Sequence, residues 1–197
     1  MKKINGFEKA TVYTGESNQL PKGGYIVKIM DCKEIHGEKN GDSFSYLDFA
    51  YDVIEGEYKD HFKELYKNDS NEVKKWKGIY KAFIPQEGKQ YYEEDVNRFK
   101  TMIVNFEESN QGYHWDWDET KLKGKTIGVV YGEKEFETPQ GNVIVITEPR
   151  YFTSAENVRT GKFKEPKFKK LQKSQDFTSD FKTPENDSDN ELPFWKV

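Results

Sequence analysis

Apolar and polar residues alternate along several short stretches of the chain. The clearest alternation runs through residues 44–54, where Leu47, Phe49, Tyr51 and Val53 share one face. A period of two is the pattern of a strand with one buried face. Four further stretches have strand character: 25–35, 76–84, 125–131 and 142–152. Turn residues separate them, such as the two glycines between residues 36 and 42. The pattern therefore predicts five strands.

One long helix is expected between the third and fourth strands. Within residues 92–108, apolar side chains recur at helical spacing on one stripe: Val96, Phe99, Met102, Ile103 and Phe106. The charged segment 57–75 is expected to form a short helix or an extended loop. The predicted order is β-β-β-α-β-β, a mainly β fold with one helix. This is the order of an OB-fold, a five-stranded Greek-key barrel that binds oligonucleotides on one face and in its loops.

The charge distribution divides the chain further. Residues 1–20 are polar and predict a flexible N-terminal arm before a domain at 21–158. Residues 159–173 carry a local charge of +6 and are expected to be a basic linker. Residues 174–197 carry −4, are rich in Ser, Thr and Asn, and predict a disordered acidic tail. The net charge of −4 argues against a nucleic-acid binder, but the basic segment offers a place for phosphates.

Composition narrows the cellular setting. The single cysteine, Cys32, excludes an internal disulfide framework and fits a reducing cytoplasm. No apolar run approaches the length of a membrane span, so no membrane association is expected. The sequence leaves self-association open. Aromatic residues make up 15% of the chain, which provides rings for a core and for flat ligands.

Sequence-tolerant binding of a single strand needs rings that stack on bases and cations that follow the backbone. The predicted second and third strands and the 57–67 segment supply both, and the basic segment supplies further cations for phosphate contacts. The candidate residues are Phe44, Tyr46, Trp76, Lys77, Tyr80, Lys81, Phe62, Tyr66, Lys167, Lys169 and Lys170. Alternatively, Trp76 and Tyr80 are core residues, Phe62 and Tyr66 pack inward from a helix, and the lysines of the basic segment belong to a solvated linker.

Nothing in the chain indicates a catalytic or cofactor site. The segment His114-Trp115-Asp116-Trp117-Asp118 has one histidine and two carboxylates without partnered ligands, so a surface turn is favoured over a metal site. The three histidines are scattered, and there is no glycine-rich phosphate loop. We expect no enzymatic activity, no cofactor and no metal, although composition does not exclude a metal-dependent nuclease.

The C-terminus carries a distinctive motif. Asp-Asn-Glu-Leu-Pro-Phe at 189–194 resembles the acidic tip of bacterial and phage single-stranded DNA-binding proteins, in which an OB-fold holds DNA and the tip recruits other proteins. Here three residues follow Phe194, so the chain-end carboxylate is displaced. The resemblance implies a partner-docking tip for replication and recombination proteins. Its residues are Asp189, Glu191, Leu192, Pro193, Phe194 and Trp195.

The body of the chain is also similar to a family of small phage and plasmid replication proteins from Gram-positive bacteria. The similarity lies in LPxGGY at 20–25, YLDFxYDVxEGEY at 46–58, EESNxGYxW at 107–115 and LKGK at 122–125. It implies binding and protection of single-stranded DNA during replication or recombination. The alternative from a different class is an OB-like protein-interaction module, an inhibitor or adaptor that binds no nucleic acid.

Deleting residues 174–197 should leave the fold intact and should keep or tighten binding to single strands. The deletion removes a local charge of −4 that competes with phosphates for the adjacent basic segment. Fluorescence anisotropy with a labelled oligothymidine would measure the affinity, and a thermal melt would check the fold. Weaker binding by the truncated chain would mean that the tail belongs to the DNA site or to the fold.

Overall fold

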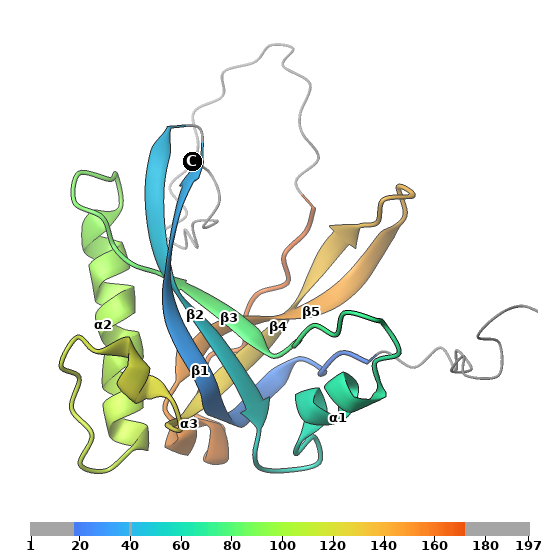
Figure 1. Ribbon diagram of the computed structural model, residues 1–197, viewed down its shortest axis with the longest axis horizontal. Helices are drawn as coiled ribbons and strands as arrows, with labels where there is room; N and C mark the ends of the chain where they lie inside the picture. The colour runs from blue at the N-terminus through green and yellow to red at the C-terminus, as the bar shows by residue number, and fades with distance from the viewer. Residues whose placement is uncertain (1–17, 40, 172–197) are drawn as a thin grey trace, which may run out of the picture.

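The computed structural model describes residues 18–39 and 41–171. Its centre is a five-stranded antiparallel sheet in the order β3-β2-β1-β4-β5 (Figure 1). The strands are β1 (Gly23–Lys39), β2 (Asp42–Val53), β3 (Ile79–Phe83), β4 (Thr126–Glu137) and β5 (Val143–Thr153). The helices are α1 (His61–Asn68), α2 (Tyr92–Ser109) and α3 (Ala155–Arg159), with a 3₁₀ turn, η2 (Glu119–Leu122). The prediction of a mainly β fold is confirmed.

The five predicted strands and the long helix occur in the predicted order, but several bounds differ. The strands β1 and β4 are longer than predicted because each continues into a hairpin that projects from the sheet (Figure 1). The strand β3 is shorter and starts after Gly78, whose carbonyl accepts a hydrogen bond from the Tyr51 amide at 2.8 Å. The charged 57–75 segment contains α1. The short helix α3 was not predicted.

The inner face of the sheet carries the main core. Alternate residues of the central strands are fully buried there: Val27, Ile29, Phe49, Tyr51, Val53, Ile127 and Val129. The helix α2 adds Phe106, which stacks on Phe49 with ring centroids 5.8 Å apart. The alternation predicted for β2 is confirmed.

Phe152 joins the two ends of this sheet. Within the described chain β3 and β5 form no hydrogen-bonded ladder, so the sheet is not closed into a barrel. Instead, the Phe152 ring on β5 lies 4.6 Å from the Tyr80 ring on β3, and it also contacts Phe49 at 5.1 Å. The Tyr80 hydroxyl donates a hydrogen bond to the Arg150 carbonyl at 3.3 Å. Side chains rather than backbone pairing therefore hold β5 against β3.

Part of the outer face is covered by the chain that follows β5. A Cβ atom at Gly24 would lie 2.8 Å from the Phe163 ring, and one at Gly128 would lie 2.5 Å from a Val158 methyl group. At Gly132 the neighbour is Pro166, at 2.7 Å. These glycines let α3 and the next residues lie directly on β1 and β4, where an amino acid with a side chain would force them away.

Up to Leu171, the basic segment packs on the domain and does not form the linker that the sequence predicts. Lys169 forms a parallel bridge with Lys134 of β4. The Glu135 amide donates to the Lys169 carbonyl at 2.9 Å, and the Lys169 amide donates to the Glu133 carbonyl at 3.2 Å. The domain therefore continues through residues 159–171, because β4 extends past the end of its pairing with β1 and leaves an edge for this segment.

Among the described residues, the helices are too short or too polar for any of them to cross a bilayer.

Replacing Phe152 by Ala should reduce the free energy of unfolding by about 3–5 kcal/mol, because the substitution removes the ring between β3, β5 and α2. Phe136, an exposed ring in the β4–β5 hairpin, is the matched control. Its replacement by Ala should change stability by no more than about 0.5 kcal/mol. Urea denaturation of both variants measures the difference. Equal losses would mean that Phe152 does not have this central role.

The stability should fall steeply in alkali. Burial raises the pKa of Tyr80 to about 12, and it also raises the pKa values of Tyr51 and Tyr131. Because the folded pKa lies above the unfolded value of 10.0, the stabilisation is complete below pH 10 and is lost as pH rises toward 12. Each such tyrosine should add about 1.4 kcal/mol per pH unit to the decline. Urea midpoints between pH 8 and pH 11 would show it, and Tyr80→Phe should make the decline shallower. An unchanged slope in that variant would contradict the assignment.

Candidate functional site

Three aromatic rings gather on the outer face of β2 and β3. We call Phe44, Tyr46 and Phe83 the ring patch. The rings of Phe44 and Tyr46 are 6.2 Å apart and nearly parallel, with an interplanar angle of 17°. Phe83 lies 5.6 Å from Tyr46 and 6.1 Å from Phe44. All three side chains are half-buried, so each ring packs on its neighbours and still keeps part of its surface open.

Strand register explains why these rings meet. Tyr46 of β2 pairs with Phe83 of β3, and directly paired residues point to the same face of a sheet. Their neighbours Leu47 and Ala82 point inward and are buried. On the other side, Phe44 pairs with Gly37 of β1. A Cβ atom at Gly37 would lie 2.5 Å from the Phe44 ring, so the glycine allows that ring to lie flat on β1.

A cation accompanies the ring patch. The Lys81 ammonium lies 4.8 Å from the centre of the Tyr46 ring, a cation–π geometry. In the ladders, Asp48 lies between Lys33 of β1 and Lys81 of β3. Its Oδ1 atom is covered and has no hydrogen-bond partner among the described residues. Lys33 is itself paired with Asp31 at 2.8 Å, so Lys81 is the cation that lies against the rings.

Trp76 and Tyr66 form a second, smaller group of rings. They lie 5.7 Å apart, and the Lys74 ammonium lies 5.7 Å from the centre of the Tyr66 ring. The Trp76 indole donates a hydrogen bond to the Tyr51 carbonyl at 3.0 Å, and its ring packs against the core. Trp76 is therefore a half-buried anchor before β3, whereas Tyr66 remains exposed.

For two of the aromatic residues predicted to stack on bases, the structure corrects the prediction. Phe62 is only 6% exposed, and its ring packs edge-on against Tyr51 at 5.7 Å. The helix α1 turns this ring inward over Gly78, so it has no face open to a base. Tyr80 pairs with Phe49 and shares its inward direction, which places the ring on Phe152. Both residues belong to the core, which was the alternative role that the sequence offered for them.

The basic candidates lie in different places. Lys77 is exposed just before β3, near the smaller ring group. Lys169 is half-buried where its backbone pairs with β4, while the neighbouring Lys167 and Lys170 are exposed. Only Lys81 is brought onto the ring patch. The partner-docking residues Asp189, Glu191, Leu192, Pro193, Phe194 and Trp195 lie outside the described residues.

The 114–118 segment forms an exposed loop before η2. Trp117 is 81% exposed and has a positive φ of 66°, and its ring lies 6.1 Å from Trp115. Lys121 pairs with both Asp116 and Asp118. No three metal-ligating side chains converge anywhere in the described part of the chain. The acidic neighbours make this loop a poor surface for phosphates.

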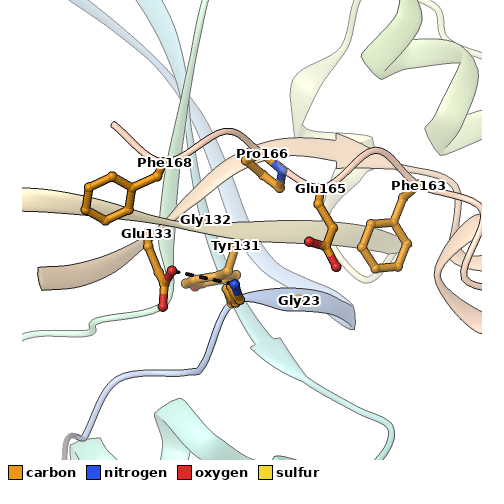
Figure 2. Close-up of a pocket in the computed structure, with 9 residues that line it drawn as sticks. Gly23, Tyr131, Gly132, Glu133, Phe163, Glu165, Pro166 and Phe168 are labelled. Carbon is orange, nitrogen blue, oxygen red and sulfur yellow. Dashed lines mark ion pairs between the residues drawn. The ribbon is translucent and has the colours of Figure 1, made fainter. Parts of the chain in front are cut away.

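One small hollow lies where residues 163–168 cross β4 (Figure 2). Phe163 and Phe168 stand at its two ends, with Pro166 between them. Its volume is about 140 Å³, and two carboxylates, Glu133 and Glu165, line it. Lys22 pairs with Glu133 at 3.7 Å. The hollow is smaller than typical ligand pockets and has the wrong charge for a nucleotide.

Sequence reasoning missed Phe83 as a member of the site. Phe83 is the last aromatic residue of the predicted third strand, and this position could have marked it as a candidate. Its place beside Tyr46 depends on the β2–β3 register, which a single sequence does not reveal. The contribution of Gly37 depends on the β1–β2 register in the same way.

No protein-family model matches the chain, and no curated protein matches it significantly.

Proposed function

We propose that the chain is a sequence-tolerant single-stranded DNA-binding protein, and that bases stack on the ring patch of Phe44, Tyr46 and Phe83. The observation that carries this proposal is three half-open rings with a lysine over one of them. Every base has a π-face, so such a surface binds bases without reading their sequence. Each stacked base contributes about 1–3 kcal/mol.

The architecture supports an OB-fold interpretation of the sheet. In an OB-fold the second and third strands provide the binding face, together with the loops β1–β2 and β4–β5. Here the ring patch lies on β2 and β3, and Phe44 belongs to the β1–β2 hairpin. The β4–β5 hairpin projects separately from the sheet in Figure 1. The long helix α2 lies between β3 and β4 in the chain. An OB-fold is a partly open barrel, and the Phe152 and Tyr80 contacts provide its side-chain closure.

The uncovered position of the ring patch also supports the proposal. The chain after β5 covers the outer face over β1 and β4, where Ile26 and Val130 are buried. Over β2 and β3 the described chain leaves the rings half-open, although Phe83 and Phe44 are as apolar as the covered residues. Apolar rings left open on a sheet are typical of surfaces that bind a partner.

The remaining parts of the proposal rest on the sequence. The chain would act without enzymatic activity in the cytoplasm, in phage or plasmid DNA replication or recombination. The C-terminal residues around Leu192 and Phe194 would recruit the replication or recombination proteins. The basic residues after α3, such as Lys167 and Lys170, would attract the phosphate backbone.

Replacing Tyr46 by Ala should weaken binding to a labelled oligothymidine by about 1–3 kcal/mol, because one stacking ring is lost. Lys81→Gln should lower the log–log salt slope by about 0.7, the value expected for one phosphate contact on a single strand. Fluorescence anisotropy at several salt concentrations measures both effects. Duplex DNA of the same length should bind more weakly than the single strand.

Trp117→Ala is the matched control, since it removes an exposed aromatic ring from the acidic loop outside the ring patch. It should leave the affinity unchanged. Equal losses in the Tyr46 and Trp117 variants would remove the ring patch from the binding site. No binding of single strands by the wild-type chain would instead favour the protein-interaction module.

A further inference from the structure

The strand β5 ends the sheet and exposes an apolar edge in its hairpin with β4. Val143, Ile144 and Val145 are 56%, 45% and 57% exposed. There is no charged residue from Thr138 to Thr147. Natural edge strands usually carry lysines, prolines or bulges that prevent pairing with another chain. This short run has none of these devices between Pro139 and Pro149.

The backbone groups of Val143 and Val145 point away from the sheet. On β4, the Glu135 amide and the Glu133 carbonyl form hydrogen bonds with the backbone of Lys169. The backbone N–H and C=O groups of Glu133 and Glu135 therefore point away from β5. In an antiparallel ladder their partners on β5 must then point away from β4. The partner of Glu133 is Thr147, whose amide bonds to the Gln19 side chain at 3.0 Å, as this rule requires.

The same rule applies two residues along. Val145 pairs with Glu135 and Val143 pairs with Glu137, so each directs its N–H and C=O to the outer edge. No described residue pairs with these four groups. Gln19 and Leu20 occupy the edge at Thr147, where the Leu20 carbonyl accepts from the Thr147 hydroxyl at 2.5 Å. The available edge is therefore short and is centred on Ile144.

We propose that this edge pairs with the same edge of a second copy of the chain, antiparallel, about a two-fold axis at Ile144. Val143 of each copy then lies opposite Val145 of the other, and about four backbone hydrogen bonds join them. Ile144 meets Ile144 of the second copy in a non-hydrogen-bonded pair. The two sheets become one continuous sheet across the axis.

Self-complementarity favours a second copy over a different partner. The three residues are apolar on both faces, so an antiparallel copy places apolar side chains opposite each other on either face. A two-fold contact of this kind is isologous and closes after two copies. The run from Thr138 to Thr147 itself brings no like charges to the contact. The β4–β5 hairpin that carries this edge projects from the sheet in Figure 1. This inference does not depend on DNA binding.

A cysteine scan of the full-length chain tests the axis. The only native cysteine, Cys32, is 3% exposed, so an introduced thiol dominates the reactivity. Ile144→Cys should form a disulfide-linked dimer under mild oxidation, because a non-hydrogen-bonded pair holds its Cα atoms about 4.5 Å apart. Val145→Cys is the matched control, since its two thiols would be on Cα atoms more than about 7 Å apart. Equal cross-linking of the two variants would overturn the register.

Sedimentation velocity tests the association itself. The wild-type chain should sediment as a dimer at micromolar concentration. Val145→Lys should raise the dimer dissociation constant at least about tenfold, because it places like charges at the paired edge. Gln140→Lys adds the same charge in the hairpin turn and should have little effect. A wild-type monomer would overturn the proposal. A monomer whose melting temperature falls in Val145→Lys would show that another part of the same chain covers the edge.

Discussion

The contact between Phe152 and Tyr80 determines the shape of this protein. The two end strands, β3 and β5, form no ladder with each other in the described chain, and Pro149 of β5 lacks an amide hydrogen for one. The strands are bent by register shifts at Ile29/Asp31 and Val130/Tyr131. The bends bring β5 toward β3, and the rings of Phe152, Tyr80 and Phe106 fill the space that remains. The core thus replaces the missing backbone pairing.

The inner face of this curved sheet is covered by the core, and its outer face is covered by another segment in one part and open in the other. Over β1 and β4, glycines allow Val158, Phe163 and Pro166 to lie directly on the strands. Over β2 and β3, aromatic residues occupy the corresponding positions, and no described segment crosses them. Glycine permits a close approach of another segment over β1 and β4, whereas the side chains of Phe44 and Tyr46 leave no space for so close an approach.

The sequence predicted most of the strands and α2 because their periodicity was clear. The inward direction of Leu47 and Phe49 follows from alternation alone. The directions of Tyr80 and Phe83 do not, because the third strand carries rings on both faces. The segment after α3 was expected to be a linker because lysines dominate it. Its apolar residues Phe163 and Pro166 were the available signal, but they pack on Gly24 and Gly132, which are distant in the sequence.

The net negative charge of the chain is compatible with the proposed DNA site, because a phosphate backbone responds to nearby charges. The body is acidic overall, yet several of its carboxylates are paired with neighbouring cations, as in Lys89–Asp42 and Arg159–Glu55. A phosphate backbone responds mainly to charges within about one Debye length, roughly 8 Å at physiological salt. Near the rings, the Lys81 ammonium lies over Tyr46, whereas Lys33 is paired with Asp31. For the proposed binding, the position of Lys81 beside the rings therefore matters more than the net charge of −4.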